Sequence, residues 1–365
     1  MEPAPQSSLI SLADYERAAA ATMEPGAHGY AYGGAGDEVT LRDNVDSWRR
    51  LAIRPRVLVG VGHRDPGVTL LGRRRPHPVV IAPMAYQRMA HPEGERAMAR
   101  AAASTGTVMC LSTLATATPA EVAEAAPGAG RWFQLYVFAD RGVSRELVDQ
   151  AAEQGYEALV ITVDLPITGI RERDLRSGVQ AATADIVASA AAAGAHGPMA
   201  PHEFTSLIDP NLRWSDIERF VQQSPLPVIL KGILTPEDAK LAREHGASAI
   251  VVSNHGGRQI DTVLAGADAL GPVVDEVGDH MDVLVDGGIR RGTDVLKALA
   301  LGASGVMVGR PVLWGLVVGG AEGAQRVLEI LLAEFDSALA LAGAPKASEL
   351  DRSFVCRAPW VAQVR

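Results

Sequence analysis

The stretch "PVILKGILTPEDAKLAREHGASAIVVSNHG", residues 227–256, contains two apolar runs with a helix-like segment between them. The runs at 227–233 and 249–256 are rich in Val and Ile, which is typical of strands that are buried on both faces. Thr235 and Pro236 form an N-cap followed by proline at the first helical position, and Gly246 is placed to cap the other end. The stretch therefore predicts a strand–helix–strand unit of a parallel sheet.

The same unit recurs along the chain from residue 78. Six further apolar runs have the character of strands, at 78–84, 108–113, 131–137, 158–164, 283–288 and 305–311. Amphipathic segments separate them, and the last helix is expected over 323–343. Eight such units within about 265 residues match the usual size of an α/β (β/α)8 TIM barrel, which we favour over an open doubly wound sheet.

The sequence predicts one domain over residues 1–365. We expect an N-terminal helical extension at 1–77, with one helix over 12–23, then the barrel at 78–345 and a C-terminal tail at 346–365. A long loop after the fourth strand, residues 165–213, is expected to act as an active-site lid, because connections of this length are uncommon unless they are functional or disordered.

Composition limits the classes of function. The chain carries a net charge of −9, which argues against nucleic acid as a partner, because binding it requires a basic face. Only two cysteines occur, at Cys110 and Cys356, so we expect no disulfide scaffold and no metal site. Neither a signal peptide nor a membrane-spanning run is evident, and the sequence predicts a soluble cytoplasmic protein.

Polar residues collect where the predicted strands end. In a barrel of this kind the active site lies at the carboxyl ends of the strands. The residues expected there are Pro83, Met84, Ala85, Ser112, Gln134, Tyr136, Thr162, Asp164, Lys231, Ser253, His255, Arg258, Asp286, Gly287, Gly288, Arg290, Gly309 and Arg310.

Strands seven and eight end in "DGGIRRG", residues 286–292, and "GRP", residues 309–311. Glycines allow the backbone to approach an anion closely, and exposed N–H groups and a guanidinium can then hold phosphate oxygens. These two turns predict a phosphate site, the alternative being ordinary tight turns.

His255 and Arg258 are expected at the rim of the barrel. A neutral imidazole is a base near physiological pH, and an arginine can bind a carboxylate with two hydrogen bonds. Asp164 is placed to orient the imidazole. The alternative is that His255 only completes a turn. That alternative would not explain why Arg258, Asp164 and Lys231 are expected at the same rim.

Several motifs resemble the family of FMN-dependent α-hydroxy-acid oxidases and dehydrogenases. "SNHGGRQID", residues 253–261, is similar to the active-site signature of that family. "IAPMAYQRMAHPEGE", "WFQLYV", "TVDLPITGIRERD" and "LVDGGIRRGTDVLKALALGA" follow its order, so the resemblance covers almost the whole chain. It implies FMN as cofactor and oxidation of an (S)-2-hydroxy acid to the 2-keto acid, with O2 giving H2O2.

The resemblance also implies roles for individual residues. His255 would take a proton from the substrate, Asp164 would orient His255, and Tyr136 would bind the substrate oxygen. Arg258, Arg171 and Tyr30 would hold the substrate carboxylate. Lys231 would stabilise negative charge on the flavin. The remaining cofactor contacts would come from Pro83, Met84, Ala85, Ser112, Gln134, Thr162, Ser253, Asp286, Gly287, Gly288, Arg290, Gly309 and Arg310.

Some positions depart from what is usual in the family. Ala31 and Leu114 stand where many members have aromatic residues, which leaves room for a larger substrate. Tyr86 adds an aromatic hydroxyl, and "APMAYQ" is similar to 4-hydroxymandelate oxidases. The expected substrate is therefore aromatic, such as mandelate or 4-hydroxymandelate, and a homotetramer is expected from the resemblance.

Other interpretations stay open at this point. Glycolate or lactate is an alternative substrate, and an acceptor other than O2 would make the protein a dehydrogenase. A Schiff-base lyase using Lys231 and a non-enzymatic binder of a phosphorylated ligand are alternatives from other classes.

Overall fold

The computed structural model describes residues 8–177 and 206–360. Its centre is a closed barrel of eight parallel strands in the order β4-β5-β6-β7-β8-β9-β10-β11, and β11 pairs with β4 to close it. The strands are β4 (Val79–Ile81), β5 (Val108–Leu111), β6 (Arg131–Leu135), β7 (Leu159–Thr162), β8 (Val228–Ile233), β9 (Ala249–Val252), β10 (Asp282–Val285) and β11 (Gly305–Val308). The predicted TIM barrel is therefore confirmed, and the strands are shorter than the apolar runs that predicted them.

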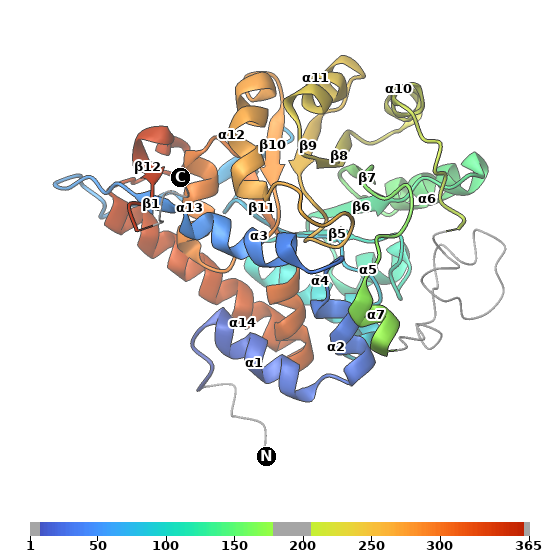
Figure 1. The fold of residues 1–365 in the computed structure, drawn as a ribbon, viewed down its shortest axis with the longest axis horizontal. Coiled ribbons are helices and arrows are strands. Elements are labelled where there is room, and N and C mark those ends of the chain that lie inside the picture. The colour runs from blue at the N-terminus through green and yellow to red at the C-terminus, as the bar shows by residue number, and fades with distance from the viewer. Residues whose placement is uncertain (1–7, 178–205, 361–365) are drawn as a thin grey trace.

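Helices surround the barrel and alternate with its strands (Figure 1). They are α4 (Gly94–Thr105), α5 (Pro119–Ala125), α6 (Arg141–Glu153), α10 (Trp214–Gln223), α11 (Pro236–Glu244), α12 (Gly266–Val277), α13 (Gly292–Ala300) and α14 (Arg310–Ala342). In α11, Thr235 caps the helix as predicted, because its side chain accepts a hydrogen bond from the Asp238 N–H. α14 begins directly after β11 and is kinked at Gly319 and Gly320.

The N-terminal extension holds more structure than the one helix that its sequence predicts. α1 (Leu12–Thr22) matches the prediction, and α2 (Pro25–Tyr32) and α3 (Val39–Arg49) follow it. The Gly/Tyr-rich segment is a weak helix former in isolation, and α2 is stabilised by tertiary packing, with the Tyr32 ring stacked on that of Trp314 at 5.9 Å. α1 packs on α14, and Trp48 of α3 is fully buried.

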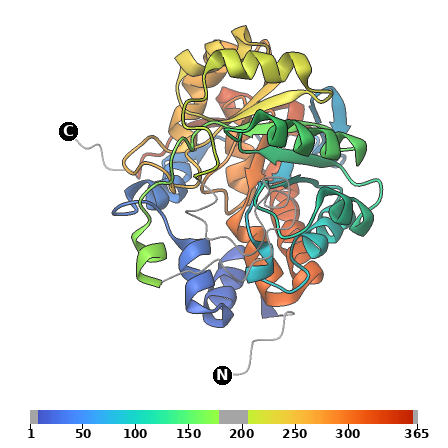
Figure 2. The same cartoon turned by 90° about the vertical axis from the view of Figure 1, so that its right-hand side faces the viewer.

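The described residues of the segment after β7 contain two helices. α7 (Glu172–Ser177) lies against α2, as Figures 1 and 2 both show, and α10 precedes β8. The part of the predicted lid at 178–205 lies outside the described residues.

Short elements complete the fold. β1 (Leu51–Ile53) pairs antiparallel with β12 (Val355–Arg357), and β2 (Val68–Leu70) pairs with β3 (Arg73–Arg75). Single turns of 3-10 helix occur at Gln87–Met89, Ala347–Glu349 and Arg352–Phe354. The β1–β12 pair ties the predicted tail to the N-terminal extension.

Candidate active site

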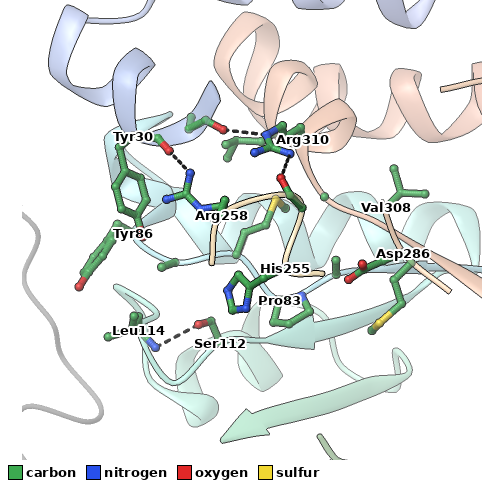
Figure 3. A pocket seen from close by; sticks show the side chains of 18 of the residues that line it. Tyr30, Pro83, Tyr86, Ser112, Leu114, His255, Arg258, Asp286, Val308 and Arg310 are labelled. Carbon is green, nitrogen blue, oxygen red and sulfur yellow. Dashed lines mark hydrogen bonds between the residues drawn. The ribbon is translucent and has the colours of Figure 1, made fainter. Parts of the chain in front are cut away.

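A chamber of about 190 Å³ opens at the carboxyl ends of the barrel strands (Figure 3). Its walls contain most of the site residues that the sequence predicts, namely Tyr30, Pro83, Met84, Ala85, Ser112, Tyr136, Thr162, Arg171, Lys231, His255, Arg258, Asp286, Gly287, Gly288, Arg290, Gly309 and Arg310. Gln134, Asp164 and Ser253 do not line the chamber. Each of these three holds a residue that does, through hydrogen bonds to Ser112, His255 and Lys231 respectively.

The turn after β9 presents His255 to the chamber. His255, Gly256 and Gly257 all adopt left-handed backbone conformations, with φ values of 59°, 64° and 74°. A side chain at Gly257 would place its Cβ 2.7 Å from the backbone nitrogen of Leu41 in α3, which excludes any residue but glycine. A left-handed non-glycine residue such as His255 is strained by about 1–3 kcal/mol and is found mostly at functional sites.

Asp164 fixes the orientation of the His255 ring. Its Oδ1 lies 2.8 Å from His255 Nδ1, and the backbone N–H of His255 donates to Ser253 Oγ at 3.0 Å. Because Asp164 is the acceptor, we assign the proton of the neutral ring to Nδ1, which leaves the lone pair on Nε2. Nε2 faces the Tyr136 hydroxyl at 3.4 Å.

The two partners are in the protonation states that a base requires. Burial raises the pKa of Asp164, but the charge and hydrogen bond of His255 outweigh this, so its pKa lies below the usual value. Burial lowers the pKa of His255 more than Asp164 raises it, so that pKa lies below 6.5. At neutral pH the pair is therefore a carboxylate and a neutral imidazole. Burial raises the pKa of Tyr136, which keeps its hydroxyl protonated.

Arg258 has one edge free for a ligand. Its Nη1 donates to the carbonyls of Tyr30 at 2.6 Å and Gly33 at 2.8 Å, and the guanidinium lies 4.8 Å from the centre of the Tyr30 ring. Within the described residues, Nε and Nη2 make no hydrogen bond, and together they match the geometry of a carboxylate.

Arg171 is engaged differently from Arg258. Its Nε donates to the carbonyl of Arg258 at 3.0 Å, and its Nη2 donates to Gln259 Oε1 at 3.1 Å. Arg171 thus holds the loop that carries Arg258, and its own contact with a carboxylate stays a prediction. Burial lowers the pKa of Arg171 to about 10, and repulsion from Arg258 adds to the shift.

Lys231 forms a buried ion pair at the base of the chamber. Its Nζ lies 2.8 Å from Ser253 Oγ and 3.0 Å from Asp286 Oδ2. Burial lowers the pKa of Lys231, but Asp286 and Asp164 raise it by more, so the ammonium is charged. The other oxygen, Asp286 Oδ1, is buried without a partner in the described part of the chain.

Ser112 and Gln134 form a second polar group beside β5 and β6. Ser112 Oγ donates to Gln134 Oε1 at 3.2 Å and accepts the N–H of Leu114 at 3.1 Å. Gln134 Nε2 is buried and has no partner among the described residues. A buried donor of this kind costs about 1–3 kcal/mol until a ligand acceptor satisfies it.

The far end of the chamber is formed by the turns after β10 and β11. Gly288 has a φ of 77°, and a Cβ there would lie 1.8 Å from the Asn44 carbonyl oxygen, so only glycine fits against α3. Arg290 stacks on the Trp314 ring at 4.9 Å. Arg310 donates to three carbonyls, of Ala31, Gly33 and Gly256, and so joins the N-terminal segment to the His255 turn. Its predicted contact with phosphate stays a prediction.

The described walls of the chamber hold excess positive charge. Arg171, Lys231, Arg258, Arg290 and Arg310 line it, whereas Asp286 is the carboxylate in its wall. Asp164 lies behind His255, and Asp174 lies 3.8 Å from Arg171. Burial lowers the pKa of Arg310 to about 9, and repulsion from Arg258 and Arg290 contributes. This excess of positive charge suits the chamber to a phosphorylated cofactor together with an organic acid.

Comparison with known proteins agrees with this geometry. The family model for FMN-dependent dehydrogenases matches residues 19–357. The chain belongs to this family. It is a flavoprotein of the (S)-2-hydroxy-acid oxidase type, and its cofactor is FMN.

The relatives similar to this chain are named for different 2-hydroxy acids. An L-lactate oxidase of Nostoc sp. is 46% identical over 364 residues, covering 96% of this chain and 98% of that protein. The 2-hydroxyacid oxidase 1 of Homo sapiens is 42% identical over 361 residues, covering 96% of this chain and 97% of that protein. A solved structure of a mandelate oxidase mutant with (S)-mandelic acid has a TM-score of 0.88 at 40% identity, covering 97% of this chain and 100% of that one.

The residues present fit FMN. Gln134 Nε2 and Asp286 Oδ1 are buried polar atoms that lack a protein partner within the described residues; Asp286 lines the chamber, and Gln134 lies behind Ser112, which lines it. Among the described residues the backbone N–H groups of Gly287 and Gly288 donate no hydrogen bond to another backbone group, so they are available to an anion, as a phosphate requires.

Three contributors to the site could not be predicted from the sequence. Asn44 of α3 exchanges two side-chain hydrogen bonds with Asn254, at 2.9 and 2.8 Å, and Trp48 Nε1 donates to the Gly287 carbonyl at 2.8 Å. Glu95 is buried and holds the turn after β4 by accepting the N–H of Gln87. No local pattern marks these residues, because their partners lie far away in the chain or in an irregular turn.

No helix in residues 8–177 or 206–360 combines the length and the apolar character needed to cross a bilayer. The same residues contain no group of three or more His, Cys, Asp or Glu side chains placed to hold a metal ion.

Proposed function

We propose that this protein oxidises an aromatic (S)-2-hydroxy acid, such as mandelate or 4-hydroxymandelate, to the 2-keto acid, and that O2 is the final acceptor and gives H2O2. The observation that carries the proposal is the mixed lining of the chamber. Arg258 and His255 share it with the small or apolar side chains of Ala31, Met89, Ala90 and Leu114. The similarity to mandelate oxidase structures supports the same substrate class.

His255 acts as the base. Its Nε2 accepts a proton from the substrate, from the hydroxyl or from the α-carbon, and the resulting imidazolium is stabilised by Asp164. The Tyr136 hydroxyl, 3.4 Å from Nε2, binds the substrate oxygen beside it. FMN, when bound, would supply the acceptor for the two electrons that the substrate loses.

Arg258 binds the substrate carboxylate through its free edge, and the carbonyl and ring of Tyr30 hold Arg258 in place. Arg171 supports this loop and adds positive charge. Two hydrogen bonds to a carboxylate fix the α-carbon relative to His255, which is the arrangement that proton transfer requires.

The remaining polar residues hold the cofactor. Lys231 is a fixed cation in a buried site and stabilises negative charge there. The ring is bound by Ser112, Gln134, Thr162 and the backbone of Pro83, Met84 and Ala85, with Ser253 behind Lys231. The phosphorylated chain is bound by Asp286, Gly287, Gly288, Arg290, Gly309 and Arg310.

A Schiff-base lyase is disfavoured by the state of Lys231. Schiff-base chemistry requires a neutral amine, and pairing with Asp286 keeps this one charged. L-lactate is the second candidate substrate, because the Nostoc relative that is 46% identical is an L-lactate oxidase.

An anaerobic substrate panel tests the proposal. Glycolate, (S)-lactate, (S)-mandelate and (S)-4-hydroxymandelate are mixed with the FMN-loaded protein, and loss of flavin absorbance is followed before air is readmitted. We expect the two aromatic acids to bleach the flavin with the highest second-order rate constants, and air to restore the colour with formation of H2O2. Faster reduction by lactate or glycolate would contradict the aromatic substrate, and a persistently bleached flavin in air would contradict O2 as acceptor.

Assembly, compartment and domain boundaries complete the proposal. A homotetramer is proposed from the family resemblance, and the adjacent side chains of Val57 and Leu58, which are 81% and 104% exposed, offer an apolar contact to such an assembly. The cytoplasm is supported by the two unpaired cysteines. We further propose that residues 1–365 form one domain, with the extension at 1–77, the barrel at 78–345, the lid at 165–213 and the tail at 346–365.

A further inference from the structure

We propose that the hydroxyl of Tyr86 determines specificity by hydrogen-bonding a polar substituent on the ring of the substrate, at the end away from the carboxylate. This inference rests on the proposed function, because it requires an aromatic 2-hydroxy acid in the chamber. It assigns a ligand group to a residue that the oxidation itself does not use.

The hydroxyl of Tyr86 lacks a partner in the protein. Tyr86 lines the chamber and is 1% exposed, and its oxygen makes no hydrogen bond within the described residues. Buried polar atoms are almost always hydrogen-bonded, so an orphaned hydroxyl in the wall of a ligand chamber calls for a ligand atom.

The position of Tyr86 is built by the surrounding turn. Its φ is 53°, a left-handed conformation that is rare for an aromatic residue. Its N–H donates to the Leu114 carbonyl at 3.0 Å, and its carbonyl accepts the N–H of Met89 at 2.9 Å. The next residue, Gln87, donates its N–H to the buried carboxylate of Glu95 at 3.1 Å. The strained conformation is thus held from both sides.

The hydroxyl lies among the groups that would surround a substrate. Tyr30, Tyr136 and Arg171 line the same chamber as Tyr86, and burial raises the pKa of the Tyr86 hydroxyl, which therefore stays protonated. The rings of Tyr30 and Tyr86 meet edge to face at 5.6 Å. Figure 3 shows the Tyr86 ring beneath that of Tyr30, with its hydroxyl pointing away from Arg258. The hydroxyl is therefore directed away from the Arg258 guanidinium (Figure 3), which binds the carboxylate.

The chemistry of Tyr86 sets the class of substituent. A protonated phenol both donates and accepts one hydrogen bond, so it pairs with a neutral group that does the same, such as a 4-hydroxyl. A site with a buried polar group also rejects an analogue that lacks the matching group, because both partners then lose a hydrogen bond. We therefore expect a preference for 4-hydroxymandelate over mandelate that depends on Tyr86.

The test compares Tyr86→Phe with a matched control, Tyr15→Phe. Tyr15 of α1 is also fully buried with an unpartnered hydroxyl among the described residues, but it does not line the chamber. The readouts are the ratio of kcat/KM for 4-hydroxymandelate to that for mandelate, and the ratio of Kd for the two corresponding keto acids, measured from perturbation of the flavin spectrum. We expect Tyr86→Phe to weaken the preference for the 4-hydroxylated compound about three- to tenfold, both in kcat/KM and in Kd. Tyr15→Phe should leave both ratios within twofold of their native values.

The failures are distinguishable. If the native protein oxidises both mandelates and Tyr86→Phe leaves their ratio within twofold, the role of Tyr86 is overturned and the proposed function stands. If neither mandelate bleaches the flavin while lactate does, both proposals are overturned together. Both variants replace an unpaired buried hydroxyl with hydrogen, so Tm should not fall, and an unchanged Tm confirms that the comparison is between folded proteins.

Discussion

Replacing Asp164 with Asn should slow the chemical step and leave the cofactor in place. The 2.8 Å contact between Asp164 Oδ1 and His255 Nδ1 is a charge-assisted hydrogen bond once the imidazole has taken up a proton. Hydrogen bonds to charged groups contribute about 1.5–3 kcal/mol, which corresponds to roughly a 10- to 150-fold loss in rate at 1.36 kcal/mol per factor of ten. An Asn that donates its amide to Nδ1 would also move the ring proton to Nε2, which removes the base.

The assay is stopped-flow reduction of the flavin under anaerobic conditions with saturating (S)-mandelate. Asp164 does not line the chamber, so we expect the FMN content of Asp164→Asn to equal that of the native protein. Asp149→Asn is the matched control, because Asp149 is an exposed residue of α6. Reduction of Asp164→Asn within threefold of the native rate would refute the argument that Asp164 supports the base.

Three further predictions concern the pH profile, the cofactor turn and the carboxylate site. The acidic limb of kcat/KM should lie below pH 6.5, since the pKa of His255 is lowered by burial and activity is lost as the ring takes a proton; a limb above pH 7 would contradict this. Gly288→Ala should reduce FMN affinity and lower the free energy of unfolding by at least about 2 kcal/mol, because its Cβ would overlap the Asn44 carbonyl and because a left-handed backbone costs a non-glycine residue about 1–2 kcal/mol. The control in the denaturant titration is Gly128→Ala, since Gly128 has a φ of 73° and open space around it. Equal losses of unfolding free energy in the two variants would contradict the packing argument. Arg258→Lys should lower kcat/KM at least tenfold because a point charge replaces a two-pronged donor, and unchanged steady-state kinetics would rule out its role.

Much of the fold could be predicted from the sequence because its signals are local. Continuous apolar runs such as 249–252 and the Thr-Pro start of α11 each fix an element without reference to distant residues. The carboxyl ends of parallel strands meet at one rim, so the position of His255 and Lys231 in a shared chamber followed from the order of the elements.

The contacts within the site could not be predicted, because they depend on segments far apart in the chain. α2 is a weak helix in isolation, yet its carbonyls and the segment after it receive the donors of Arg258 and Arg310. Nothing in the local sequence distinguishes Arg310, whose donors are occupied by protein carbonyls, from Arg258, which keeps a free edge. Asn44 likewise takes its role from a partner 210 residues away.

The base is the centre of this account, and His255→Ala tests it most directly. The measurement is the single-turnover rate of flavin reduction by (S)-mandelate without oxygen, on protein shown by absorbance to carry a full complement of FMN. The account predicts a rate lower by about 10²- to 10⁴-fold, as expected when a general base is deleted. Reduction of the His255→Ala flavin at close to the native rate would show that the proton leaves by another route.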